Sequence, residues 1–205
     1  MPIEDYERHF REHDRYWKVM PTLYHQLYVW PAAEGFLARM NWIVENARGA
    51  TLDCGCNDGT YIEAVRLRGH KTVGIDIIPI NIERARILYP DNEFHIMDVE
   101  DLKFQDESFD TVVFTETIEH LVDPKKALRE VHRVMRRGGR LLCTTTYIQN
   151  EPTHYQDFHD REVLVNLLEQ LFAIDSLSVG HAGIIQVIGS RKELLSDSEG
   201  LNCQK

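Results

Sequence analysis

The stretch Leu52-Asp53-Cys54-Gly55-Cys56-Asn57-Asp58-Gly59-Thr60 decides the fold of this chain. A short apolar run leads to an acidic residue and then to two glycines in a tight turn, and a helix follows to about residue 68. A second apolar run over residues 72–75 ends in Asp76, seventeen residues after Gly59. This order of strand, glycine turn, helix, strand and acid is typical of units that bind a nucleoside-bearing cofactor at the carboxyl ends of parallel strands.

The acids around this turn indicate which cofactor it binds. A glycine lets the backbone approach a ligand closely, and a carboxylate at Asp76 can accept hydrogen bonds from both hydroxyls of a ribose. Dinucleotide sites carry G-x-G-x-x-G with a pyrophosphate at the helix N-terminus, but Asp53 and Asp58 would repel a pyrophosphate. Asp53 would instead favour the amino group of a methionine. The turn therefore favours S-adenosylmethionine (SAM) over NAD, and the structural alternative is a glycine-rich turn without a ligand.

The composition limits the class of protein. The 205 residues, 43% of them hydrophobic, suffice for one α/β domain. No run of 18 apolar residues indicates a membrane span, the N-terminus is unlike a signal peptide, and the net charge of −10 argues against non-specific nucleic-acid binding. Cys54 and Cys56 lie too close in sequence for a disulfide, and no second pair completes a zinc site. We therefore expect a reduced, cytoplasmic setting, and no feature of the sequence specifies an oligomeric state.

Apolar periodicity and turn residues divide the chain into alternating helices and strands. We expect helices over residues 4–20, 22–30, 32–47, 61–68, 80–88, 124–136 and 160–171, and strands over 50–54, 72–76, 94–97, 111–114, 140–145, 172–179 and 183–190. The alternation predicts a doubly wound, mostly parallel α/β sheet that a hairpin closes. As domains, we expect an N-terminal helical lid over 1–48, a SAM-binding core over 49–192 and a disordered polar tail over 193–205.

Further motifs follow the glycine turn in order. They are Val73-Gly-Ile-Asp76, Asp98 after the third strand, Ser108-Phe-Asp-Thr-Val-Val113, Glu119-His120-Leu121 and Met135-Arg-Arg-Gly-Gly-Arg-Leu-Leu142. Together with residues 52–59 the chain resembles a class I SAM-dependent methyltransferase. The resemblance implies a Rossmann-like, seven-stranded sheet of order 3-2-1-4-5-7-6 with helices on both faces. One departure is Asn57, where the family has a glycine, although asparagine tolerates left-handed backbone well.

The resemblance also assigns cofactor-binding residues. It implies that the methionine end is lined by the glycine turn, that the acid after the second strand holds the ribose, and that the residues after the third strand meet the adenine. The residue that closes the fourth strand would lie beneath the methionine. These residues are Asp53, Gly55, Asn57 and Gly59 for methionine, Asp76 for ribose, Ile77, Asp98 and Val99 for adenine, and Thr115.

The segment Glu116-Thr-Ile-Glu119-His120 follows the fourth strand, and its three polar side chains would share one face of a helical turn. Three hypotheses remain open. His120 is a general base for the acceptor, because a histidine titrates near neutrality. Alternatively, Glu116, Glu119 and His120 bind Mg²⁺ or Mn²⁺, with His154 or His159 as a further ligand. In the third, Glu119 and His120 only orient the loop.

The later segment His154-Tyr-Gln-Asp-Phe158, with the Glu-His pair, resembles small-molecule methyltransferases. We therefore expect methyl transfer from SAM to a small polar metabolite at a hydroxyl, with His120, Glu119 and His154 as catalytic residues. The aromatic residues Tyr16, Trp17, Tyr24, Tyr28 and Trp30 either form a lid or pack their helices. Two alternatives stay open: a metal-dependent RNA 3′-end 2′-O-methyltransferase, which the acidic charge disfavours, and a non-catalytic SAM-binding regulatory protein.

Overall fold

The computed structural model describes residues 32–146, 154–156, 158, 160–180 and 184–193. Several expectations lie outside the described residues. They are the two helices before residue 31 with their aromatic lid, the role of His159, and the tail from residue 194 onward.

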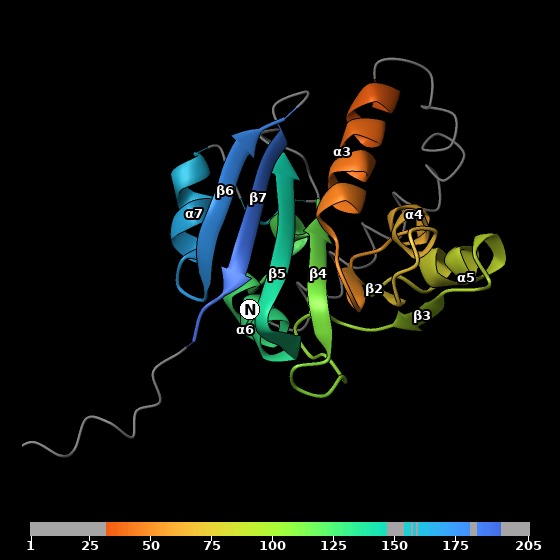
Figure 1. Cartoon of the computed structure of the whole chain (residues 1–205). Coiled ribbons are helices and arrows are strands. Elements are labelled where there is room, and N and C mark those ends of the chain that lie inside the picture. The colour runs from red at the N-terminus through yellow and green to blue at the C-terminus, as the bar shows by residue number, and fades with distance from the viewer. Residues whose placement is uncertain (1–31, 147–153, 157, 159, 181–183, 194–205) are drawn as a thin grey trace, which may run out of the picture.

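Seven strands form one mixed sheet in the order β3-β2-β1-β4-β5-β7-β6, which confirms the predicted order (Figure 1). The strands β1 to β5 run parallel to one another, whereas β7 is antiparallel to both β5 and β6. Their bounds are β1 Thr51–Cys54, β2 Thr72–Asp76, β3 Glu93–Ile96, β4 Phe109–Thr115, β5 Met135–Thr146, β6 Phe172–Val179 and β7 Ile184–Arg191.

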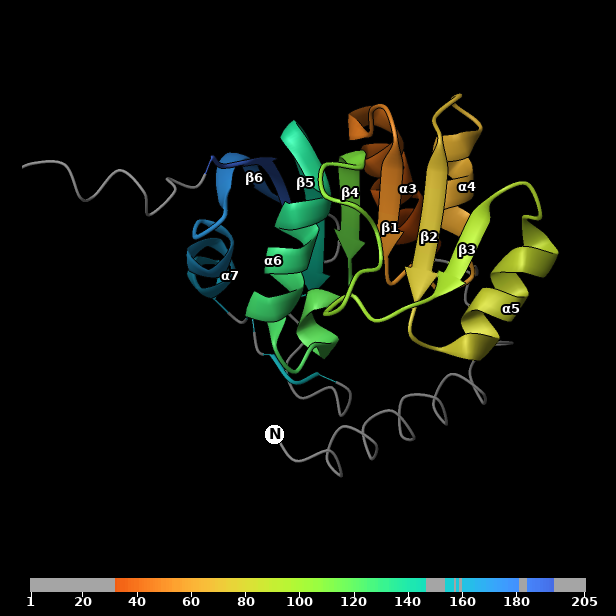
Figure 2. The same cartoon turned by 90° about the horizontal axis from the view of Figure 1, so that it is seen from below.

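Helices cover both faces of the sheet (Figure 2). The helices α3 Ala32–Asn46, α4 Thr60–Arg66 and α5 Pro79–Leu88 share one buried cluster, and α6 Pro124–Val134 and α7 Arg161–Leu168 share the other. On the first face, Phe36 of α3 stacks on Tyr61 of α4 with ring centroids 4.7 Å apart. No helix among the described residues is long and apolar enough to cross a lipid bilayer.

The start of α6 follows local signals, but its end does not. Asp123 accepts a hydrogen bond from the Lys126 amide at 3.0 Å, and Pro124 occupies the first turn. The helix was expected to continue to residue 136 and to break at Gly138-Gly139, and this was wrong: it ends at Val134, and β5 begins at Met135. The fully buried Met135 pairs with Phe109 in the sheet, so burial in the core overrides the local break signal.

The arrangement of the strands fixes where a ligand can bind. The connections from β1 lead to β2 on one side, while β4 lies on its other side, so the strand order reverses at β1. In open α/β sheets a ligand binds outside the carboxyl ends of the strands at such a reversal. The sequence motifs at residues 54–60 and 116–120 both follow strands that end at this edge.

Candidate functional site

A cavity lies at the carboxyl edge of β1, β2 and β4 and of the segment after β3. Six of the nine predicted cofactor residues line it, as do Glu116 and His120. These six are Gly55, Asn57, Asp76, Ile77, Asp98 and Val99. The remaining three, Asp53, Gly59 and Thr115, are buried next to the cavity without lining it.

Asp76 is held by two backbone amides and one side-chain amide. Its Oδ2 accepts hydrogen bonds from the Asn57 amide at 3.0 Å and from Nδ2 of Asn81 at 3.3 Å. Its Oδ1 accepts one from the Ile78 amide at 2.8 Å. The side chain is 8% exposed, and burial raises the pKa of this carboxyl while the three donors act in the opposite direction. The carboxylate is therefore fixed in place before a ligand arrives.

The glycine turn takes the left-handed backbone that its sequence suggests. Gly55 has a φ of 79° and Asn57 a φ of 50°, so asparagine does replace the glycine of the family pattern in this conformation. A Cβ on Gly55 would lie 2.3 Å from Oγ1 of Thr117. That hydroxyl in turn lies 3.1 Å from the Cys54 carbonyl oxygen and 2.9 Å from that of Thr115. Gly55 thus makes room for a side chain of the next motif, in addition to any ligand.

Gly59 has a structural place in this fold. It precedes α4 with a φ of 81°, and a Cβ there would lie 2.6 Å from the ring of Phe94. Thr115 is 6% exposed at the end of β4. Neither residue lines the cavity, so their expected contacts with the methionine remain predictions.

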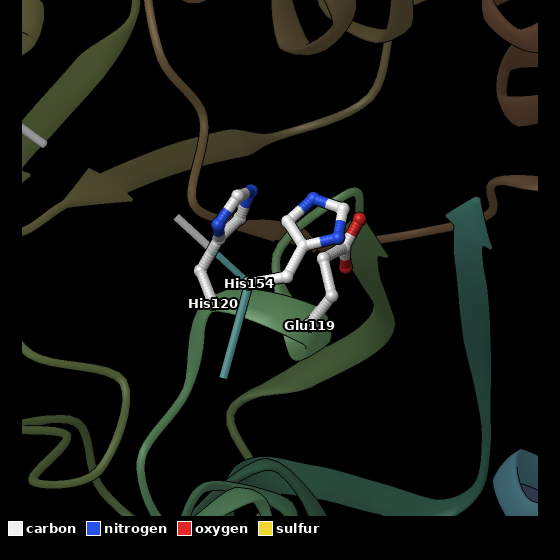
Figure 3. A group of neighbouring side chains, drawn as sticks. All are labelled: Glu119, His120 and His154. Carbon is white, nitrogen blue, oxygen red and sulfur yellow. The ribbon is translucent and has the colours of Figure 1, made fainter. Parts of the chain in front are cut away.

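A second group of side chains adjoins the cavity. Ligand atoms of Glu119, His120 and His154 all lie within 4.8 Å of one another (Figure 3). The short helix η1 Ile118–His120 carries the first two, and the ring centroids of His120 and His154 are 4.9 Å apart at 76°. Glu119 is 1% exposed, and burial together with the charge of Glu116 raises its pKa well above the usual range. His120 belongs both to this group and to the cavity wall.

Hydrogen bonds from a distant segment bring His154 to this group. The amides of Tyr155 and Gln156 both donate to the Glu119 carbonyl oxygen, at 2.8 and 3.0 Å. Nε2 of Gln156 donates to the Leu121 carbonyl oxygen at 3.0 Å. The segment after β5 is therefore attached directly to η1. His154 belongs to this segment and directly precedes the two residues that make these bonds.

Glu116 lies apart from this group. The regular turn covers only residues 118–120, and Glu116 precedes it with a φ of 48°. Glu116 therefore does not share one helical face with Glu119 and His120, as a longer turn would require. Its Oε1 accepts a hydrogen bond from the Thr144 hydroxyl at 2.8 Å and lies 3.9 Å from a guanidinium nitrogen of Arg39.

The comparisons with known proteins agree with this geometry. Residues 52–143 match a family model described as a methyltransferase domain. This match makes residues 52–143 similar to a methyltransferase domain and agrees with the resemblance to class I SAM-dependent methyltransferases. This domain holds the cavity and the first two members of the neighbouring group, while His154 lies after its last matched residue.

Relatives and solved structures are similar to different extents. The chain is 34% identical over 125 residues to a ubiquinone biosynthesis O-methyltransferase of Pseudomonas syringae, covering 57% of this chain and 53% of that relative. It is 31% identical over 147 residues to a probable SAM-dependent methyltransferase of Mycolicibacterium smegmatis, covering 66% and 57%. The chain thus spans about half the length of these relatives. A protein of Pyrococcus horikoshii shares the fold, with a TM-score of 0.72, 18% identity and coverage of 87% and 99%.

Buried polar atoms of the methyltransferase domain fit a bound SAM. Among the residues that the structure describes, neither carboxyl oxygen of Asp53 has a hydrogen-bond partner, and neither does Oδ1 of Asn81. Asp53 is 1% exposed, and burial together with the charge of Asp76 raises its pKa to about 8. Unsatisfied buried polar groups are costly, and a cofactor with an ammonium, a sulfonium and several hydroxyls supplies what they lack.

Three residues near the cavity were missed at the sequence level. Asn81 and Thr117 line the cavity, and Arg39 brings a cation next to Glu116. Arg39 had a detectable signal, because it is the only basic residue between 32 and 47 and lies beside apolar positions of that helix. Thr117 and Asn81 had no comparable signal, since both are ordinary polar residues, Thr117 directly before η1 and Asn81 in the first turn of α5.

Replacing Gly55 by alanine in the methyltransferase domain will destabilise the fold more than the same change at Gly69. Both glycines have positive φ, 79° and 89°, so both variants carry a backbone cost of about 1–2 kcal/mol. Only Gly55 adds a clash, because a Cβ at Gly69 meets nothing within 4 Å. Thermal unfolding measures both. Equal losses would show that Thr117 moves aside without cost.

Replacing Asp53 by asparagine will stabilise the unliganded protein, and more so at higher pH. The carboxyl ionises near 3.8 when unfolded and near 8 when folded. Unfolding therefore releases its proton between these values, and the free energy of unfolding falls as the pH rises through this window. Asparagine removes this loss, so its advantage should grow by on the order of 2–3 kcal/mol between pH 5 and pH 7. Chemical denaturation at both pH values measures it, and a constant difference would contradict the assignment.

Proposed function

We propose that the protein transfers the methyl group of SAM to a hydroxyl of a small polar acceptor. The observation that carries this proposal is the position of His120, which lines the cofactor cavity and also contacts His154 ring to ring. A base at the border of the two sites can take a proton from an acceptor that faces the methyl group. Catalysis of this kind depends chiefly on alignment and on exclusion of water.

In this proposal, some residues of the chain bind the cofactor and others act on the acceptor. Asp76 accepts hydrogen bonds from the ribose, and the Gly55 turn lies against the methionine. His120 accepts the proton of the acceptor hydroxyl as the oxygen attacks the methyl carbon, and His154 and Glu119 orient that imidazole. The bond from methyl to oxygen forms while the bond from methyl to sulfur breaks, and S-adenosylhomocysteine (SAH) leaves. Bound SAM supplies only the activated methyl group.

The relatives support a hydroxyl acceptor. The Pseudomonas relatives are named ubiquinone biosynthesis O-methyltransferases. The net charge of −10 and the acids in the cavity wall oppose a polyanionic acceptor, which disfavours RNA. A small acceptor with a phenolic or vicinal hydroxyl fits best.

The test is transfer of a radiolabelled methyl group to a panel of catechols and other small phenols. We expect a methyl ether product with the wild type and none with the Asp76→Ala variant. If SAH binds in calorimetry but no acceptor of any class is methylated, the non-catalytic SAM-binding role replaces this proposal. If SAH does not bind, the cofactor assignment itself fails.

A metal-assisted variant of this function is favoured by one observation, the convergence of Glu119, His120 and His154. The structure brings together one carboxylate and two imidazoles. The sequence suggested the carboxylates of Glu116 and Glu119 with the imidazole of His120, and His154 or His159 as a further ligand. This set suits Mn²⁺ better than Mg²⁺, which prefers oxygen ligands. A metal there would hold and acidify an acceptor diol.

Mn²⁺ binding distinguishes the two variants. If these residues are ligands, Mn²⁺ added to the SAH-loaded protein will lose its free-ion paramagnetic resonance signal, and His154→Ala will weaken binding by about 10–100-fold. The matched control is His70→Ala, because His70 precedes β2 at the opposite edge of the sheet. An unchanged Mn²⁺ signal with the wild type would leave the metal-free route, in which His120 alone takes the proton.

A further inference from the structure

The charged side chains in the wall of the cofactor cavity have one sign. Among the described residues that line it, Asp76, Asp98, Glu100 and Glu116 carry carboxyl groups, and none is a lysine or an arginine. Walls of one charge sign and low dielectric constant attract ions of the opposite sign. SAM has a positively charged sulfonium, whereas its product SAH has a neutral thioether. The wall therefore faces the sulfonium cation of SAM before the reaction and the neutral thioether of SAH after it.

Of the four acids in this wall, Glu116 is the nearest in sequence to Glu119 and His120, which form a group with His154. It follows β4, and its charge reaches Glu119 strongly enough to raise the pKa of that carboxyl. Of the three other acids, Asp76 ends β2 and the remaining two follow β3, at the predicted ribose and adenine sites. In the proposed reaction the methyl group lies between the cofactor and the three side chains of Glu119, His120 and His154. Glu116 is therefore the acid of the cavity wall that we expect beside the sulfonium.

The backbone of Glu116 is held in a costly conformation. Among the described non-glycine residues, only Asn57, Glu107 and Glu116 have a positive φ. Such a conformation costs about 1–2 kcal/mol and persists where the surroundings enforce it, often at functional sites. Here Thr144 enforces it: its carbonyl oxygen accepts from the Glu116 amide at 3.0 Å, and its hydroxyl donates to Oε1 at 2.8 Å. The fold thus fixes the direction of this carboxylate.

Neighbouring cations offset this wall only partly. A guanidinium nitrogen of Arg39 lies 3.9 Å from Oε1 of Glu116, and Nζ of Lys126 lies 3.8 Å from Oε2 of Glu100. Both distances are at the long end for an ion pair. The carboxyl of Asp76 has no cation paired with it among the salt bridges of the described residues.

We propose that Glu116 makes this site bind the cationic methyl donor more tightly than the neutral product. The inference rests on the proposed function, because it takes the cavity as the SAM site. It adds a specificity determinant that the shape of the cavity does not provide, since SAM and SAH differ by one methyl group and one charge. The product would then leave easily and inhibit weakly.

The experiment compares SAH with sinefungin, which carries an ammonium group where SAM has its sulfonium and cannot donate a methyl group. Calorimetric titrations use the wild type, Glu116→Gln and the matched control Glu100→Gln, which removes one wall charge at the adenine end. We expect sinefungin to bind the wild type about tenfold more tightly than SAH, the ratio that one charged hydrogen-bonding contact provides. The ratio should fall toward one in Glu116→Gln and stay high in Glu100→Gln.

Three results would overturn the inference. They are equal affinities of the wild type for the two ligands, a preference that persists in Glu116→Gln, and a preference that disappears equally in Glu100→Gln. A salt titration tests the same point on the wild type alone. Added salt should reduce the ratio of the sinefungin affinity to the SAH affinity if this ratio depends on charge. Failure of the wild type to bind either ligand would instead refute the cavity as a SAM site, and so the proposed function.

Discussion

Replacing Asp76 by alanine lowers the affinity for SAH by about 100-fold or more. The carboxylate is expected to accept both ribose hydroxyls, and hydrogen bonds to a charged group contribute about 1.5–3 kcal/mol each. The same change leaves the Asn57 and Ile78 amides, which now donate to this carboxylate at 3.0 and 2.8 Å, without their acceptor. The glycine turn then loses one of its attachments to the end of β2, while the Gly55 and Cys56 amides still donate to the Ile75 carbonyl oxygen. Calorimetric titration of SAH measures the loss.

Two variants separate the contact from a general loss of structure. Asp76→Asn keeps the size and one acceptor oxygen, so it should recover part of the affinity. Asp91→Ala is the surface control, because the Asp91 side chain is 76% exposed, and it should bind SAH like the wild type. Wild-type affinity in a folded Asp76→Ala protein would place the ribose elsewhere.

Replacing His120 by alanine lowers the turnover number by about 10²–10⁴-fold, the range for removal of a general base. Because His120 also contributes to the cavity wall, SAH affinity should fall as well, but much less than turnover does. This difference separates a role in proton transfer from a role in packing. Single-turnover methyl transfer and SAH calorimetry on the same variant measure the two effects.

The matched control for His120 is again a histidine at the other edge of the sheet. His70→Ala should change neither quantity, since His70 lies between α4 and β2. A His120→Ala variant that loses affinity and turnover by the same factor would make His120 a binding residue. His154 would then be the remaining candidate base.

Most residues of the cavity wall that the sequence analysis named could be predicted because their signals are local. Asp76 ends an apolar run, and Gly55 and Asn57 occupy turn positions that demand left-handed backbone. A strand end and a turn are settled by residues a few positions apart, and parallel strands then bring such ends to one edge. The strand order followed from the family resemblance, and the structure agrees with it.

The group of Glu119, His120 and His154 depended on contacts between distant segments. Glu116 was grouped with Glu119 and His120 on spacing alone, but the turn is too short to align them. His154 joins the group because two amides after it bond to the Glu119 carbonyl oxygen, a pairing that no spacing rule provides. The predicted end of α6 at residue 136 was wrong for a similar reason, since Met135 pairs with a residue of β4 and so belongs to the sheet.

The shared position of His120 also bears on ligand binding. The imidazole of His120 belongs both to the cavity wall and to the group that it forms with Glu119 and His154. Each of the two ligands therefore contacts a side chain that also contacts the other ligand. Thermodynamic linkage makes this influence reciprocal: a donor that tightens acceptor binding is itself held more tightly by the acceptor, and by the same factor. We therefore expect the donor and the acceptor to bind cooperatively, with each ligand changing the affinity for the other by the same factor.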